Sequence, residues 1–161
     1  FFPYEAAYKK TKFIKKVSIL TDSRIDNATV KIHFYKADAN GFPGEELLTR
    51  DYIVNIQKGV VRNGFDLTDL NLKMPKSGLF IGFEKLLISK NKFEKTIVNS
   101  NTQKTTIQVI FYPLVLYNYV ERDYLFTFSG GKWSRQTNDK TQSESGKIKV
   151  YEPAINLVLT N

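Results

Sequence analysis

The chain has 161 residues, a length that fits one domain and buries about 70% of the unfolded surface. Its apolar content of 42% and aromatic content of 14% argue against disorder and favour β-structure. The chain has no cysteine, which excludes structural disulfides, thiolate zinc sites and cysteine nucleophiles.

The net charge of +8 favours acidic partners through long-range attraction. The basic charge together with the aromatic residues leaves a nucleic-acid-binding β-barrel as a less favoured alternative. Lysines outnumber arginines and no cold-shock-like aromatic motif is present, so we expect no nucleic-acid partner. The apolar segments are too short to cross a bilayer, and we expect no transmembrane segment. The densest basic cluster is interpreted as a solvated surface near an edge strand; it consists of Lys9, Lys10, Lys12, Lys15 and Lys16.

Residues 1–11 are predicted to form an arm or linker ahead of a single β-sandwich domain at 12–161. The arm combines aromatic residues with lysines, which is typical of an interface anchor and its rim. We therefore expect the arm to bind a partner and to be removable without unfolding the domain. Its proposed contact residues are Phe1, Phe2, Tyr4 and Tyr8. Because the chain opens without Met, we expect a processed chain or an excised domain.

The first strand is expected at 13–20, followed by a hairpin at 28–56 that organises the rest of the chain. Val30, Ile32 and Phe34 share one face of its first strand, and polar or amphipathic residues alternate with them. This period of two is typical of a half-buried strand. A loop at 37–44 with Gly and Pro leads to the returning strand at 52–56.

The middle of the chain mixes strands with turn and loop signals. Asn63-Gly64 predicts a tight turn, and the apolar segment 79–84 predicts a central strand. Residues 89–106 are polar and lack periodicity, which predicts a long insertion loop. Pro113 marks a bulge or bend within the apolar run 107–120, because proline cannot donate to a strand ladder.

Further short strands follow in the last third of the chain. Tyr124, Phe126 and Phe128 alternate on one face of a strand, and Gly130-Gly131 predicts a turn into the next one. A polar loop is expected at 136–146, before closing strands at 147–151 and 155–159. Nine or ten short strands with Gly and Pro turns predict an all-β protein, an antiparallel β-sandwich that is jelly-roll-like with long loops.

Several segments in this order carry a family resemblance. They are Ile14-Lys-Lys-Val-Ser-Ile, Val30-Lys-Ile-His-Phe-Tyr, Gly41-Phe-Pro-Gly-Glu-Glu-Leu-Leu, Phe65-Asp-Leu, Gly78-Leu-Phe-Ile-Gly-Phe-Glu and Gly131-Lys-Trp-Ser. The order resembles the β-sandwich region that follows a carboxypeptidase-regulatory-like domain in bacterial cell-envelope proteins. The resemblance implies a non-enzymatic module in the cell envelope, in the periplasm or at the outer membrane.

Three kinds of residue group are candidates for a chemical site. Asp38, Asn40 and Glu45 offer oxygen ligands at a spacing loosely like a calcium loop, but they lack the rest of that signature and also fit ordinary turn chemistry. His33 is the only histidine and lies in a regular strand with no nucleophile motif nearby, so a sheet-face role is favoured. No pair of carboxylates is distinguished as a glycosidase pair. We therefore expect no enzymatic activity, no metal and no cofactor.

The favoured function is a structural, assembly or protein-binding module that contacts another cell-envelope protein or complex. The alternative is a carbohydrate-binding module, because aromatic faces with polar edges bind sugars. Its candidate residues are Tyr112, Tyr117, Tyr119 and Trp133.

Overall fold

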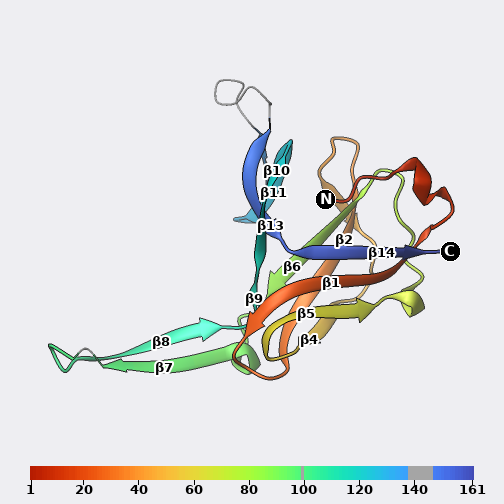
Figure 1. Cartoon of the computed structure of the whole chain (residues 1–161). Helices are drawn as coiled ribbons and strands as arrows, with labels where there is room; N and C mark the ends of the chain where they lie inside the picture. Colours follow the sequence, from red (N-terminus) through yellow and green to blue (C-terminus); the bar gives the residue numbers. More distant parts are fainter. Residues whose placement is uncertain (99, 138–146) are drawn as a thin grey trace.

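The computed structural model describes residues 1–98, 100–137 and 147–161, and β-strands dominate it (Figure 1). The helices within these residues are three short 3-10 turns: η1 (Ala6–Lys9), η2 (Thr68–Leu70) and η3 (Ser89–Asn91). Each strand pairing between the described elements is antiparallel. The prediction of an all-β protein built from antiparallel sheets is therefore confirmed.

The first sheet forms around β1 (Phe13–Ser23). Val17 lies opposite both Leu157 of β14 (Ile155–Thr160) and Phe65 of β5 (Gly59–Asp66), so these two strands flank β1 on opposite edges. The short β9 (Leu114–Val115) pairs with the end of β1 beyond β14. Alternate residues of β1 are buried from Val17 onward, which is the period of two expected of a strand with one face on a core.

The second sheet forms around β2 (Ala28–Ala37). On one edge β2 pairs with β4 (Tyr52–Ile56) and, through Tyr35 and Ala37, with β3 (Pro43–Glu46); on the other it pairs with β6 (Leu79–Lys85). The hairpin expected at 28–56 is thus confirmed, with β3 inserted in its loop.

One hydrophobic cluster joins the two sheets. Ile14 and Val17 of β1 belong to it together with Val30, Ile32 and Phe34 of β2, and all five are buried. The inward face predicted for β2 is therefore confirmed. Burying a side chain of this size stabilises a fold by about 1.5–3 kcal/mol, so this cluster is the main source of stability.

Three two-stranded ribbons extend from the sheets. Figure 1 shows one of them running away from the sheets and the other two lying close together. The pairs are β7 (Lys92–Val98) with β8 (Thr105–Phe111), β10 (Tyr117–Arg122) with β13 (Ile148–Pro153), and β11 (Tyr124–Ser129) with β12 (Lys132–Thr137). The turn expected at Gly130-Gly131 joins β11 to β12, and both glycines have positive φ.

Several expectations about loops and turns were wrong. Residues 89–106 contain η3, β7 and the start of β8 instead of a structureless loop. Asn63-Gly64 lies inside β5, because the Asn63 side chain donates to Thr21 Oγ1 at 3.0 Å and accepts from Gln57 N at 3.0 Å. Fourteen strands are formed in the described part of the chain, compared with nine or ten expected. Of the loop expected at 136–146, residues 138–146 lie outside the described residues.

Candidate functional site: an exposed tyrosine strip

Three tyrosines form an exposed row on the β10–β13 ribbon. Tyr117 and Tyr119 are two residues apart on β10 and share a face, and Tyr151 of β13 lies directly opposite Tyr119. The Tyr119 and Tyr151 ring centroids are 4.8 Å apart. The three side chains are 56%, 59% and 65% exposed, respectively. We call Tyr117, Tyr119 and Tyr151 the tyrosine strip.

The opposite face of this ribbon is partly buried. Val120 and Val150 form a cross-strand pair there, and Val150 is buried. Arg122 and Glu152 share that face, and Arg122 Nε donates to Glu152 Oε2 at 2.8 Å. The tyrosine strip lies on the other face, and all three of its side chains face solvent.

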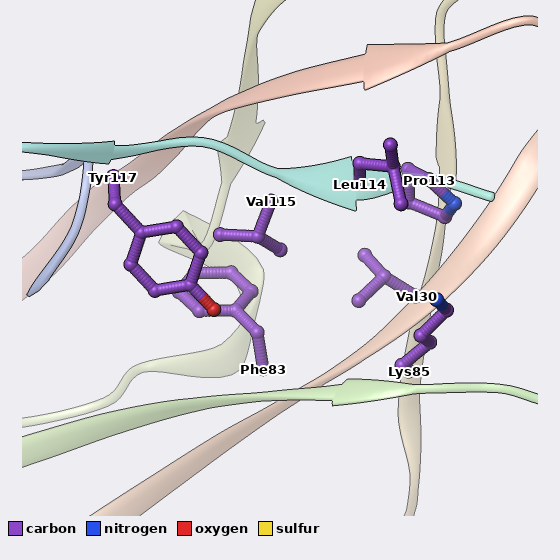
Figure 2. Close-up of a pocket in the computed structure, with 7 residues that line it drawn as sticks. All are labelled: Val30, Phe83, Lys85, Pro113, Leu114, Val115 and Tyr117. Atoms are coloured by element: carbon purple, nitrogen blue, oxygen red, sulfur yellow. The ribbon is translucent and has the colours of Figure 1, made fainter. Parts of the chain in front are cut away.

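A shallow hollow adjoins one end of the strip (Figure 2). Its volume is about 240 Å³, below the 300–1,000 Å³ usual for small-molecule pockets. Its lining is mostly apolar, and Lys85 is the charged residue among Val30, Phe83, Lys85, Pro113, Leu114, Val115 and Tyr117. Tyr117 belongs to both the hollow and the strip, so the two form one continuous surface.

The four residues predicted to bind glycan do not form a single platform. Tyr117 and Tyr119 are exposed on one face, as expected. Tyr112 is 3% exposed, with its ring centroid 6.0 Å from that of Phe93, so the expectation that it reaches the surface was wrong. Trp133 lies half-buried on β12, against Tyr35.

Tyr151 is the member of the strip that sequence reasoning missed. It lies in the strand expected at 147–151, and neighbouring strand residues such as Val150 and Tyr151 point to opposite faces. The register that places it opposite Tyr119 joins residues far apart in the chain, so local patterns could not reveal it.

Residues 1–11 lie against the second sheet. Phe2 exchanges two backbone hydrogen bonds with Leu79, of 2.8 and 2.9 Å. Phe2, Tyr4 and Tyr8 pack against the core cluster, and the Phe1 ring centroid is 4.5 Å from that of Phe80. Of the four predicted contact residues, Phe1 alone is classed as exposed, at 44%.

The aromatic face of β11 packs partly inward. The Phe126 ring meets Phe42 and Phe80 edge-on, each at a centroid distance of 5.0 Å. Arg135 of β12 lies over the Tyr124 ring, with Cζ 4.4 Å from the centroid. Phe128, at the far end of β11, is exposed. These contacts attach the β11–β12 ribbon to β6 and to the loop after β2.

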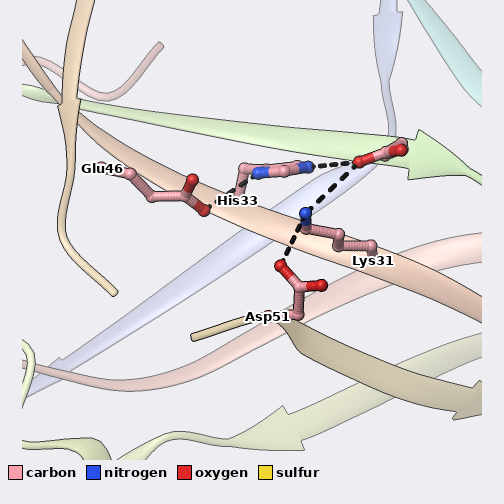
Figure 3. A network of polar contacts seen from close by, with 5 residues as sticks. Lys31, His33, Glu46 and Asp51 are labelled. Atoms are coloured by element: carbon pink, nitrogen blue, oxygen red, sulfur yellow. Dashed lines mark hydrogen bonds and ion pairs between the residues drawn. The ribbon is translucent and has the colours of Figure 1, made fainter. Parts of the chain in front are cut away.

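A polar network covers the outer face of β2 (Figure 3). The two ring nitrogens of His33 lie 2.9 Å from Glu46 Oε1 and 2.8 Å from Glu84 Oε2, so the imidazole bridges β3 and β6. Lys31 Nζ lies 2.7 Å from Asp51 Oδ1 and 3.7 Å from Glu84 Oε2.

Hydrogen bonding between the two groups raises the pKa of Lys31 and lowers that of Asp51, which favours their charged forms. His33 occupies the sheet face as expected, among carboxylates and a lysine. The network connects three strands of one sheet and contains no nucleophilic hydroxyl or thiol.

The residues considered for calcium make separate contacts. Asp38 Oδ1 accepts hydrogen bonds from the backbone N–H groups of Asn40 and Phe42, both at 2.8 Å, which closes the turn. Glu45 pairs with Lys36, and that hydrogen bond lowers the pKa of Glu45. Among the described residues no group of three or more His, Asp or Glu side chains is arranged to hold a metal ion.

Comparisons with protein families, with curated proteins and with solved structures found no match to this chain. The chain is therefore described as an all-β protein with several antiparallel sheets, and no family is identified. Within the described ranges, none of the helices has the length and apolar character needed to cross a bilayer.

Proposed function

We propose that the protein is a non-enzymatic binding and assembly module whose contact surface is the tyrosine strip with its adjoining hollow. The observation that carries the proposal is the exposure of Tyr117, Tyr119 and Tyr151 on one face of the β10–β13 ribbon. The proposed partner is another protein.

The chemistry of the strip supports a protein partner. Tyrosine supplies a large, rigid contact area with a polar edge, and a few aromatic anchors carry most of the binding energy at protein interfaces. The hollow is too small for a typical cofactor but suits one apolar side chain of a partner. Lys85 in the hollow and the net charge of +8 favour a partner with carboxylates around that side chain.

The cellular setting belongs to the same proposal. The resemblance to regions of bacterial cell-envelope proteins supports a location in the envelope, in the periplasm or at the outer membrane. We also propose that the sheets around β1 and β2 are the two layers of a jelly-roll-like sandwich, supported by the hydrophobic cluster to which both contribute.

The test combines capture with reconstitution. The protein is used as bait for an envelope extract, the captured partner is purified, and its affinity is measured by calorimetry. Tyr119→Ser with Tyr151→Ser should weaken binding at least tenfold, about 1.4 kcal/mol. Val158→Ser, on β14 near the end of β1 that lies away from β9, is the matched exposed control and should bind normally. Equal affinity of all variants would refute the tyrosine strip as the contact surface.

A glycan is the second candidate ligand, favoured by the same pair of neighbouring amphipathic rings, Tyr119 and Tyr151. Sugars stack on aromatic faces, and the phenolic hydroxyls can hydrogen-bond to sugar hydroxyls. A glycan array probed with the protein and with the double serine variant distinguishes the two candidates. Saturable binding to a glycan, lost in the variant, would replace the protein partner with a carbohydrate.

A further inference from the structure

The β7–β8 ribbon has one edge without any charged residue. In the described part of the chain, β8 pairs with β7 and with no other strand. Its sequence, Thr-Thr-Ile-Gln-Val-Ile-Phe, contains no charge, proline or glycine. Ile107 and Val109 are 62% and 44% exposed. An unpaired, uncharged edge with exposed apolar residues is a template for pairing with another strand.

The two strands of the ribbon differ in how they are protected. β7 carries Lys92, Glu94 and Lys95, and charged side chains on an edge strand discourage pairing with another chain. The β7 edge is therefore protected over Lys92 to Lys95, whereas the β8 edge carries no charge along its whole length. In addition, an isolated two-stranded ribbon is only marginally stable in water, whereas three or more strands are stable.

We propose that β8 pairs with β8 of a second copy of this chain, antiparallel and with the two-fold axis at Gln108. Ile107 would then lie opposite Val109 of the second copy, and Thr106 opposite Ile110. Such pairs of β-branched residues stabilise antiparallel sheets. The two ribbons would form one four-stranded sheet with β8 strands in the centre and β7 strands outside.

The charge distribution favours a second copy as the occupant. The uncharged β8 strands meet without repulsion, and the lysines of β7 stay on the outer strands. The two β7 strands would be about three strand spacings, or about 14 Å, apart. This exceeds the Debye length of about 8 Å at physiological salt, so their repulsion is largely screened. Because each copy carries +8, dimerisation should strengthen as salt concentration rises.

Cysteine crosslinking tests this register, since the chain has no cysteine of its own. Gln108→Cys would place two thiols directly opposite each other, within the Cα separation of 4.4–6.8 Å that a disulfide requires. Thr105→Cys is the matched control on the same strand, because its two copies would be about 20 Å apart. Mild oxidation should crosslink the first variant into a dimer and leave the second monomeric.

Sedimentation of the intact chain provides a second measurement. At about 100 µM, above the micromolar Kd expected of a small interface, the protein should be dimeric. Val109→Lys should make it monomeric, whereas Ile97→Lys on β7 should leave the dimer intact. A monomeric parent protein, or equal crosslinking of Gln108→Cys and Thr105→Cys, would overturn the proposal.

Discussion

A single buried amide, Asn91, connects the base of the β7–β8 ribbon to β2. Its Nδ2 donates to the carbonyl oxygens of Thr29 and Leu86 at 2.8 and 2.9 Å, and its Oδ1 accepts from Thr29 N at 2.8 Å. Asn91→Ala would leave buried polar groups of Thr29 unpaired, which costs about 1–3 kcal/mol for each group. We expect urea unfolding to show a loss of about 3 kcal/mol.

Asn118→Ala is the control for this prediction, because Asn118 is exposed on β10. Substitutions of this kind usually change stability by less than about 0.5 kcal/mol. Similar unfolding midpoints for the two variants would show that the Asn91 amide does not anchor the ribbon.

Gly78 is predicted to resist substitution. Its φ is +97°, and an added Cβ would lie 2.4 Å from the Phe1 ring and 3.3 Å from Phe2 O. Gly78→Ala should therefore lower stability by about 1–3 kcal/mol. Gly82→Ala is the matched control, since its Cβ would meet His33 Cβ at an ordinary 3.6 Å. Thermal melts that rank Gly82→Ala as the more damaging change would contradict this prediction.

Asp66 gives a pH-dependent prediction. The carboxylate accepts hydrogen bonds from Thr68 N and Thr68 Oγ1, at 2.8 and 2.6 Å, and these bonds lower its pKa below the usual 3.8. A lowered folded-state pKa stabilises the protein above the unfolded pKa, and this contribution is lost as pH falls through the folded value. Asp66→Asn should thus lower the melting temperature at pH 7, and the difference should shrink at pH 2. A difference that stays constant over this range would contradict the assignment.

The strands were easier to predict than the contacts they make. The alternation of Val30, Ile32 and Phe34 identified β2 and its buried face, since burial on one side of a strand forces a period of two. Local sequence patterns gave the wrong secondary structure where tertiary contacts determine it. Asn63 reads as a turn residue, yet its buried side-chain hydrogen bonds fix it within β5. Polar β7 reads as a loop, yet it pairs with β8 along its length.

The candidate site residues were also predicted only where the local sequence pattern was enough to identify them. Tyr117 and Tyr119 are identified by their spacing on β10, whereas Tyr151 joins them only through long-range register. Tyr112 was selected for the same reason, as an aromatic residue with a polar edge. Its side chain is instead buried at the base of the β7–β8 ribbon, where Tyr112 N donates to Asn91 O at 2.8 Å. The burial of Tyr112 depends on its contacts with Asn91 and Phe93, about 20 residues earlier in the chain, and local sequence patterns do not reveal such contacts.

The N-terminal segment is expected to be part of the folded structure. Deleting residues 1–11 would remove the backbone pairing of Phe2 with Leu79 and the packing of Tyr4 and Tyr8 on the core. Calorimetry should show a melting temperature lower by several degrees, as about 1–2 kcal/mol is lost. Lys9→Ala with Lys10→Ala is the control, because both side chains are exposed. An unchanged melting temperature after the deletion would restore the sequence-based interpretation of a separable arm.

At the scale of the whole molecule, the parts that stabilise the fold differ from the parts that are proposed to bind partners. The sheets around β1 and β2 bury the core cluster, whereas the ribbons extend from them and expose most of their side chains (Figure 1). Residues on the ribbons can bind a partner without any rearrangement of the core, since binding residues often lie on segments that a rigid scaffold positions. The tyrosine strip and the β8 edge lie on separate ribbons, so partner binding and self-pairing are expected to be independent.

Site-specific photo-crosslinking in cells tests the central claim most directly. A photoreactive phenylalanine analogue is placed at Tyr119 in the tyrosine strip and, as the control, at exposed Val158 of β14. We predict one defined crosslinked protein from position 119 that is absent from position 158 and that binds the purified module in vitro. No protein crosslink at position 119, or the same products from both positions, would contradict the proposal that the tyrosine strip binds a protein partner.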